Sequence, residues 1–324
     1  MIPNTRLNTA EILTLKSVKG IGAQSIRALA ESSLTLEELI YSDPDTLSKW
    51  VKGSSKNAGI NGIISLSNSD SDRFQETLTE LEAKGVSVIS FWDSNYPRLY
   101  RVLKNPPPLI YIRGNKTLLN FPKSVAIVGT RSNSKQAQQI ALATAREFCK
   151  RDYLIVSGLA LGIDTAGHLG ALEVSGLTAA ILVDILDIYP KENAGLAEQI
   201  LEAGGILISE NMPGEAFGKA AFVSRDRLQS GLSQGVFVIE TSEKGGTMHT
   251  ARFAQEQSRL VYCPDYSLVP DYDYDWERYS GIQQLLDQGL AKSYSAKDYD
   301  AIDRNLSEQQ RKLQSSLSQI SLFG

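Results

Sequence analysis

Residues 125–168 read VAIVGTRSNSKQAQQIALATAREFCKRDYLIVSGLALGIDTAGH, and this stretch decides the fold. Two continuously apolar runs, Val125–Val128 and Leu154–Val156, lie on either side of a helix-length segment, Lys135–Lys150. Strands that are apolar without alternation are typical of a parallel sheet that is covered on both faces. The stretch therefore predicts a strand, a helix and a second, parallel strand.

The same alternation continues to about residue 264. Helix-length segments such as Ala194–Ala203 and Thr250–Gln257 separate further apolar runs, which are Ala179–Val183, Ile206–Ile208, Val236–Ile239 and Leu260–Tyr262. Regular alternation of this kind is typical of an open, doubly wound sheet. We expect an α/β fold with a mainly parallel Rossmann-like sheet, preceded by a small helical domain.

We expect residues 1–115 to form that N-terminal helical domain and its lead-in, and residues 116–290 to form the Rossmann-like core. Capping signals at Asn8-Thr9 and Asp43-Pro44 and the amphipathic segment Asp70–Lys84 predict helices. The turn Lys19-Gly20-Ile21-Gly22 resembles the hairpin of helix-hairpin-helix DNA-binding proteins, and a plain connector between helices explains it equally well. The polar residues 291–324 predict a flexible tail.

Composition restricts the class of protein. Of 324 residues, 42% are hydrophobic and 22% are charged, which is typical of a globular protein with a sizeable core. No run approaches the roughly 18 apolar residues of a membrane span, and no signal peptide is evident, so we expect a cytoplasmic protein. The net charge of −4 argues against a chain coated in nucleic acid and still leaves room for one basic pocket.

Two cysteines, Cys149 and Cys263, and two histidines, His168 and His249, show no metal-ligand spacing. We expect neither a metal nor a cofactor. The chain also lacks the Walker phosphate loop, the Gly-x-Gly-x-x-Gly of dinucleotide-binding proteins and a serine in a nucleophile elbow. These absences argue against a nucleoside triphosphatase, a dinucleotide-binding enzyme and a serine hydrolase.

In a doubly wound sheet, ligands bind beyond the carboxyl ends of the strands. Three loops at such ends combine glycines, hydroxyl groups and the start of a helix: Gly129-Thr130-Arg131, Ser157–Asp164 and Glu243–Thr250, which includes Gly245-Gly246-Thr247. Glycine lets a ligand approach the backbone, free N–H groups at a helix start attract an anion, and arginine can donate twice to a phosphate. Each loop alone reads as a tight turn, but together they predict a phosphate-binding site.

Asp164 and His168 have the i, i+4 spacing of a helix and could form an acid–base pair. The structural interpretation is favoured: Asp164 caps the helix or anchors the loop, and His168 packs beside it.

Several runs resemble the DNA-processing protein A (DprA, also called Smf) family, a Rossmann-like branch of the Smf/DprA–LOG superfamily. They are VAIVGTR, SGLALGIDTAGHLGAL, YPKEN, LISENMPGE, FVSRDRLQSGLS and GGTMHTARFAQEQ, and their order and spacing hold from about Gly85 to Pro264. The resemblance implies a protein that is not an enzyme. It implies a single-stranded DNA-binding recombination mediator that protects incoming DNA in natural transformation, helps to load the RecA recombinase and forms a homodimer.

By motif, the resemblance implies DNA contacts at eight positions: Arg131, Ser157, Gly158, Gly162, Lys191, Lys219, Arg225 and Arg227. Five cations around anion-binding loops would form a groove that follows the backbone of a strand. Three departures from the family pattern indicate a divergent branch. Val183–Asp187 replaces a glycine-containing segment, Asp226 stands where asparagine is usual, and Gly245-Gly246-Thr247 replaces Ser-Gly-Ser.

Two other functions remain open. The first is a LOG-type phosphoribohydrolase, which releases the base of a nucleoside monophosphate. The signature of such enzymes resembles Pro-Gly-Gly-x-Gly-Thr followed closely by a catalytic Glu, and Gly245-Gly246-Thr247 is its counterpart here. Here the first Glu after Thr247 is Glu256, too late to serve as that acid or base. The second is a nucleotide-sensing domain of a defence system.

The terminal residues Gln319, Leu322 and Phe323 resemble a peptide that binds the replication sliding clamp, although such a tail can also fold back onto its own domain.

Overall fold

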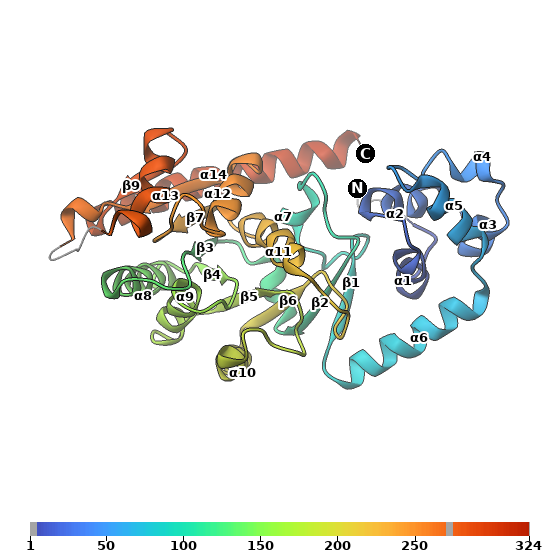
Figure 1. Cartoon of the computed structure of the whole chain (residues 1–324), viewed down its shortest axis with the longest axis horizontal. Coiled ribbons are helices and arrows are strands. Elements are labelled where there is room, and N and C mark those ends of the chain that lie inside the picture. The colour runs from blue at the N-terminus through green and yellow to red at the C-terminus, as the bar shows by residue number, and fades with distance from the viewer. Residues whose placement is uncertain (1–4, 270–274, 324) are drawn as a thin grey trace. The chain divides into compact units, whose positions relative to one another are not determined.

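The continuously apolar runs of the sequence form neighbouring strands of one sheet, as predicted. The structure is a computed structural model that describes residues 5–269 and 275–323, except for the side chains of residues 316 and 318–323. The chain divides into two compact units (Figure 1). One comprises residues 1–96, 104–111 and 319–324, and the other comprises residues 97–103 and 112–318.

Helices make up most of the first unit. Its helices are α1 (Thr9–Ser17), α2 (Ala23–Ala30), α3 (Leu36–Ile40), α4 (Pro44–Leu47), α5 (Lys56–Ile64) and α6 (Asn68–Ala83). The predicted caps are confirmed, because the side chains of Asn8 and Asp43 accept from the backbone at the first turns of α1 and α4. Buried leucines such as Leu15, Leu29 and Leu39 form the core of this unit.

The turn Lys19-Gly20-Ile21-Gly22 connects α1 to α2 and packs on α5. Gly20 has a φ of +93°, and a Cβ there would lie 2.8 Å from the carbonyl oxygen of Ser55. The side chain of Ile21 in turn occupies the space that a Cβ on Gly59 would need. Packing against α5 therefore accounts for Gly20 without a bound ligand.

The sheet follows the doubly wound pattern. Its strands are β1 (Ser87–Ser90), β2 (Leu109–Gly114), β3 (Ser124–Val128), β4 (Leu154–Ser157), β5 (Thr178–Leu182), β6 (Ile206–Ser209), β7 (Gly235–Val238), β8 (Leu260–Pro264) and β9 (Lys292–Tyr294). Within the described residues the strand order is β1-β2-β6-β5-β4-β3-β7-β8-β9, and every pairing from β6 to β9 is parallel. The predicted α/β fold with a mainly parallel sheet is confirmed.

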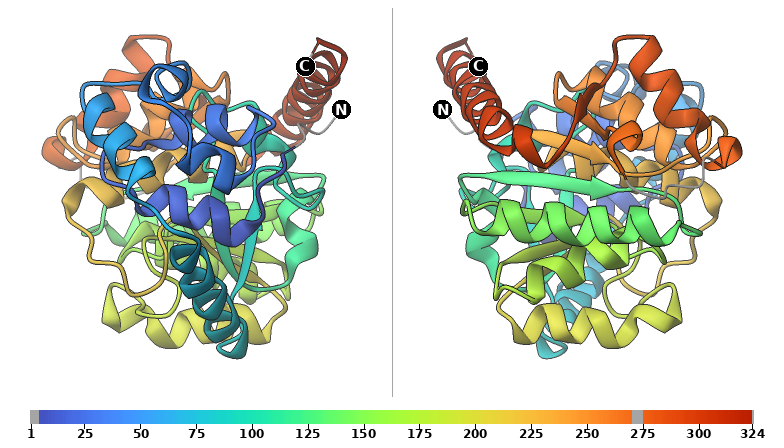
Figure 2. Two further views of the ribbon diagram at one scale, coloured as in Figure 1. Left: turned by 90° about the vertical axis from the view of Figure 1, so that its right-hand side faces the viewer. Right: turned by 90° about the vertical axis from the view of Figure 1, so that its left-hand side faces the viewer.

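Helices of the second unit cover both faces of this sheet. They are α7 (Arg98–Arg101), α8 (Lys135–Cys149), α9 (Ile163–Leu172), α10 (Ala194–Glu202), α11 (Lys219–Gly231), α12 (Thr247–Glu256), α13 (Trp276–Asp287) and α14 (Tyr299–Phe323), with short 3-10 turns η1 (Lys116–Asn120), η2 (Lys191–Asn193), η3 (Tyr266–Leu268) and η4 (Ala296–Asp298). In the right-hand view of Figure 2, α8 to α10 lie on one side of the strands, and α12 and α13 lie on the other. Helix α14 packs against α8, where the ring of Tyr299 meets that of Phe148.

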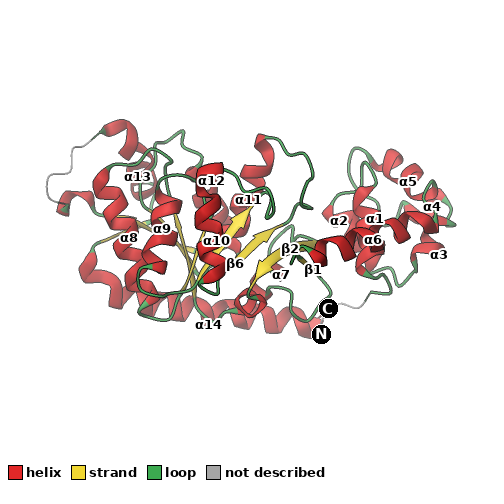
Figure 3. Ribbon diagram, turned by 90° about the horizontal axis from the view of Figure 1, so that it is seen from below, coloured by secondary structure: helices red, strands yellow, loops and turns green. Residues whose placement is uncertain are grey.

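The C-terminal segment, predicted to be a flexible tail, contains β9 and the long helix α14 (Figure 3). The reason is an apolar face that the polar composition conceals. Ile302 and Leu306 are buried, and Leu306 fills the space beside Gly235 at the start of β7. Tyr294 is also buried, and its hydroxyl lies 2.9 Å from that of Thr144 on α8. The side chains of Gln319, Leu322 and Phe323 lie outside the described residues.

The strand order places a switch point between β3 and β7. The chain adds β4, β5 and β6 on one side of β3 and then returns to add β7 on the other side. The loops after β3 and β7 therefore diverge and leave a crevice at their carboxyl ends, which is where doubly wound sheets bind their ligands.

Candidate functional site

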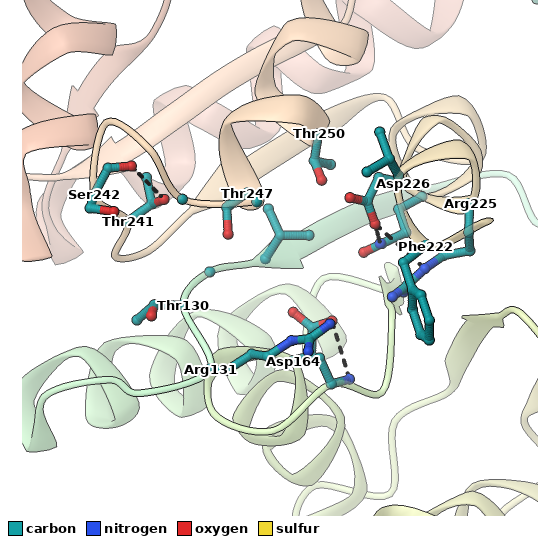
Figure 4. A pocket seen from close by; sticks show the side chains of 17 residues that line it. Thr130, Arg131, Asp164, Phe222, Arg225, Asp226, Thr241, Ser242, Thr247 and Thr250 are labelled. Atoms are coloured by element: carbon teal, nitrogen blue, oxygen red, sulfur yellow. Dashed lines mark hydrogen bonds and ion pairs between the residues drawn. The ribbon is translucent and has the colours of Figure 1, made fainter. Parts of the chain in front are cut away.

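A cavity of about 380 Å³ lies at this switch point; we call it the inner cavity (Figure 4). Loops from three strand ends and one face of α11 enclose it. Its lining includes the predicted site residues Gly129, Thr130, Arg131, Asp164, Arg225, Gly245, Gly246 and Thr247. In Figure 4, the hydroxyl groups of Thr247 and Thr250 point from α12 toward Arg131 and Asp164. The structure thus brings together the three loops that the sequence predicts to act jointly.

The loop after β3 packs closely against the loop after β4. A Cβ on Gly129 would lie 2.5 Å from the side chain of Ile163, and a Cβ on Gly162 would lie 2.4 Å from the carbonyl oxygen of Thr130. Gly162 also has a φ of +81°, which favours glycine. Contact between the two loops therefore accounts for both glycines.

Gly158 makes room for a buried arginine. A Cβ on Gly158 would lie 1.5 Å from Nη1 of Arg225 and 2.7 Å from Oδ2 of Asp164. Arg225 is 5% exposed, and its Nη1 donates to the carbonyl oxygen of Ile181 at 2.9 Å. The guanidinium thus lies beneath the inner cavity, beside both the loop and the sheet.

Asp164 anchors the loop after β4, as the structural interpretation expects. Its Oδ2 accepts from the backbone N–H of Gly158 at 3.0 Å and of Ala160 at 3.4 Å. Burial raises the pKa of Asp164 to about 6, and the positive charge of Arg225 opposes this shift. The carboxylate therefore has a structural task and still faces the inner cavity.

Asn193 is a positioning residue that the sequence analysis missed. Its side-chain amide donates to the carbonyl oxygen of Leu159 and to the hydroxyl of Thr165, each at 2.8 Å. Leu159 has a φ of +58°, an unfavourable conformation for a residue with a Cβ. Asn193 ends the run YPKEN, in which the sequence analysis singled out only Lys191. The family resemblance of this run therefore pointed to the segment, although not to Asn193 itself.

Two buried side chains of this region, Ser157 and His168, form hydrogen bonds within the core. The hydroxyl of Ser157 donates to the carbonyl oxygen of Ile127 at 2.6 Å, and it is completely buried. The hydroxyl of Thr178 donates to the carbonyl oxygen of Ile155, so it must accept from Nδ1 of His168, which lies 2.7 Å away. Burial lowers the pKa of His168 to about 3, so the imidazole is neutral. Neither Ser157 nor His168 lines the inner cavity.

The loop after β7 supplies backbone donors. A Cβ on Gly245 would lie 2.4 Å from Oγ1 of Thr241, whereas a Cβ on Gly246 would meet nothing within 4 Å. Within the described residues, the N–H groups of Gly246 and Thr247 make no hydrogen bond at the start of α12. Such groups can bind an anion or a carbonyl oxygen.

A second cavity, the outer cavity, adjoins the inner one and shares Arg131 with it. Its lining comprises Arg131, Leu161, Tyr189, Pro190, Lys191 and Glu192. Tyr189 is 48% exposed, and its ring packs on that of Phe222, which in turn packs on Phe217. The guanidinium carbon of Arg131 lies 6.0 Å from the centre of the Phe222 ring. This cluster of aromatic rings was not predicted, because its members come from two distant segments of the chain.

The other predicted cations differ in their availability. Lys219, at the start of α11, is exposed. Lys191 is exposed and forms an ion pair with Asp187. Arg227 forms a largely buried ion pair with Glu210 and does not line the inner cavity.

Within residues 5–269 and 275–323, no group of His, Cys, Asp and Glu side chains could hold a metal ion. No helix in this part of the chain is long and apolar enough to cross a membrane.

Comparison with known proteins agrees with the predicted resemblance. The family model for DNA recombination-mediator protein A matches residues 87–304. The DNA processing protein DprA of Bacillus subtilis is 33% identical over 227 residues, which cover 70% of this chain and 74% of that protein. The DNA processing protein DprA of Streptococcus pneumoniae is 35% identical over 210 residues, which cover 64% of this chain and 71% of that protein.

Solved structures extend the comparison. The X-ray structure of DprA from Streptococcus pneumoniae superimposes with a TM-score of 0.73 at 27% identity, covering 91% of this chain and 97% of that one. A structure of DprA from Helicobacter pylori, which is described in terms of its single-stranded DNA binding mode, gives a TM-score of 0.59 at 28% identity and covers 68% of this chain and 96% of that one. The chain belongs to the DNA recombination-mediator protein A (DprA/Smf) family.

Proposed function

We propose that this chain binds single-stranded DNA as a recombination mediator and is not an enzyme. In this proposal it acts in the cytoplasm as a homodimer, protects incoming DNA during natural transformation and helps to load a RecA-type recombinase. Family membership supports the proposal, and the Helicobacter pylori relative is described as binding single-stranded DNA.

The observation that carries the proposal is the position of Arg131. This exposed cation belongs to both cavities and lies over the ring of Phe222, next to the exposed ring of Tyr189. Proteins that bind single strands combine cations, which meet the phosphates, with aromatic rings, on which the bases stack. Duplex DNA keeps its bases stacked on one another, so this combination favours an unpaired strand.

The test is fluorescence anisotropy with a single strand, a duplex and a mononucleotide, each over a series of salt concentrations. Binding to a single strand releases roughly 0.7 counterion per phosphate contact. If Arg131 and Lys219 each meet one phosphate, the double variant Arg131→Ala, Lys219→Ala lowers the salt slope by about 1.4. Lys150→Ala with Arg304→Ala removes two exposed cations elsewhere and serves as the matched control. Unchanged binding by the first variant refutes the assignment of the site.

The proposed partners need separate tests. Assembly of RecA filaments on single strands that carry single-strand-binding protein reports recombinase loading, and analytical ultracentrifugation reports the dimer. We propose that Gln319, Leu322 and Phe323 are the residues that would contact a sliding clamp. Titration of the clamp with the full chain and with Leu322→Ala, Phe323→Ala tests it.

Nucleotide hydrolysis is the alternative, because two carboxylates, Asp164 and Asp226, line the inner cavity. Oδ2 of Asp164 already accepts from backbone N–H groups, and Glu256 lies at the far end of α12, roughly 13 Å along the helix from Thr247. Incubation with AMP and GMP, followed by chromatography for the free base, tests this alternative. Release of adenine or guanine would establish an enzyme and would contradict our proposal.

A further inference from the structure

The wall that α11 contributes to the inner cavity carries hydrogen-bond acceptors that lack donors. Gln229 is 2% exposed, and its Nε2 donates to Oδ1 of Asp226 at 2.9 Å. This bond fixes the amide group, yet Oε1 of Gln229 has no hydrogen-bond partner among the described residues. Oδ2 of Asp226 makes no hydrogen bond within the same residues, and both side chains line the cavity. A buried acceptor without a donor is unfavourable, so this wall is suited to a ligand with N–H groups.

The charges around the inner cavity restrict that ligand further. Nε of Arg225 forms an ion pair with Oδ1 of Asp226 at 3.5 Å, and Asp164 and Arg131 line the same cavity, so two carboxylates face two guanidinium groups. A phosphate placed inside would lie close to both carboxylates, and a metal cation would lie close to both arginines. A neutral group that offers hydrogen-bond donors meets neither repulsion.

A nucleobase is such a group, and the four bases differ in what they offer to a carboxylate. Guanine has two adjacent donors, N1–H and the N2 amino group, which match the two oxygens of one carboxylate. Adenine and cytosine place an acceptor nitrogen beside their single amino group. Thymine has one N–H between two carbonyl oxygens, which would face the acceptors of the wall.

We propose that the inner cavity selects guanine, with the N1–H and N2 amino groups of the base donating to the carboxylate of Asp226. This inference rests on the proposed binding of single-stranded DNA and names the base that the site prefers. The cavity of about 380 Å³ has room for one purine. The sugar and phosphates remain outside, near Arg131 and the outer cavity. The guanine O6 is then left for donors on α12, where the hydroxyl groups of Thr247 and Thr250 face the same space.

The test compares full-length protein on an oligothymidylate, on the same strand with one central guanosine, and on strands with inosine or adenosine at that position. Inosine retains N1–H and lacks the N2 amino group. Lithium buffer prevents association of the guanosine strands with one another. One bidentate contact predicts that the guanosine strand binds about tenfold more tightly than oligothymidylate, with inosine between the two.

Asp226→Asn is the protein variant, because it preserves shape while it removes the charge and one acceptor. We expect the preference for guanosine to fall below about twofold in this variant. Asp152→Asn makes the same chemical change just before β4, at the amino ends of the strands and so opposite the cavity, and should keep the full preference. Circular dichroism of each variant checks that it is folded, and the comparison of strands on the natural protein needs no variant.

The outcomes separate this inference from the proposed function. Equal binding of all strands by the natural protein overturns the selection of guanine and leaves the proposed DNA binding intact. A preference for guanosine that survives in Asp226→Asn overturns the role of Asp226. If no oligonucleotide binds in a salt-dependent manner, the proposed function fails and this inference fails with it.

Discussion

Gly158→Ala tests whether the glycines of the site serve the packing of the protein or the approach of a ligand. The sequence favours the second role, because Gly158 lies in a loop at a strand end. The structure favours the first, because a Cβ on Gly158 would lie 1.5 Å from Nη1 of Arg225. The methyl group therefore requires the guanidinium to move.

The cost follows from what that movement breaks. Arg225 is 5% exposed, and Nη1 loses its 2.9 Å hydrogen bond to the carbonyl oxygen of Ile181. A hydrogen bond to a charged group contributes about 1.5–3 kcal/mol, and overpacking of a core adds about 1–3 kcal/mol. We expect the variant to lose about 3 kcal/mol. For a unit of this size, that corresponds to a fall of roughly 6–12 °C in melting temperature.

The assay is differential scanning calorimetry, which resolves the transitions of the two units. Gly195→Ala is the matched control, because Gly195 is exposed in α10 and a Cβ there would meet nothing within 4 Å. We expect the control to change stability by less than about 1 kcal/mol. A Gly158→Ala protein that melts like the natural one refutes the packing argument. If it also failed to bind DNA, the glycine would serve ligand approach instead.

Three further predictions follow from buried or stacked side chains. Because burial lowers the pKa of His168 to about 3 from the usual 6.5, the unfolded chain binds a proton that the folded chain rejects, and stability falls as the pH drops below 6.5. Between pH 7.5 and pH 5, urea denaturation should show the natural protein losing about 2 kcal/mol relative to His168→Asn; parallel curves would contradict this. Phe222→Ala should weaken binding of a single strand at least about fivefold in the anisotropy assay, because a base loses its stacking partner. Tyr41→Ala is the control at an exposed aromatic residue. An equal loss of affinity in both variants would exclude specific stacking on Phe222. Leu306→Ala should lower the free energy of unfolding by about 2–4 kcal/mol while Arg304→Ala leaves it unchanged, and no effect of Leu306→Ala would mean that α14 does not contribute to the core.

The sheet could be predicted from the sequence because its strands are buried on both faces. Every residue from Ser124 to Val128 is buried, and the run is apolar after its first serine; the same holds for Ile206–Ser209 apart from its terminal serine. Such runs indicate their structure without reference to distant residues. Helix α14 shows the opposite case. Its buried residues, including Ile302 and Leu306, are spaced along a largely polar segment. The apolar face of the helix can therefore be recognised only once the helix is packed on the sheet.

The position of the site could be predicted, whereas the roles of its residues could not. Loops at strand ends converge by topology, so the region of Gly129-Thr130-Arg131 follows from the strand pattern. The role of Gly158 depends on Arg225, which lies far along the chain. The aromatic neighbours Tyr189 and Phe222 likewise meet only in the folded protein. Spacing along the chain contains no signal for such pairs.

The pairing of charges determines what a bound strand must contribute. Arg227 and Glu210 form a largely buried ion pair, and removing either charge from its partner is costly. Lys191 and Asp187 are both exposed, and such a pair contributes at most about 1 kcal/mol, so a phosphate can replace Asp187 at little cost. Arg131 needs no such exchange at its exposed face. Few cations are therefore available to bind phosphates, and this agrees with the net negative charge of the chain. Stacking and base contacts must then supply much of the binding free energy, and the affinity of this protein should depend less on salt than the number of its predicted cations implies.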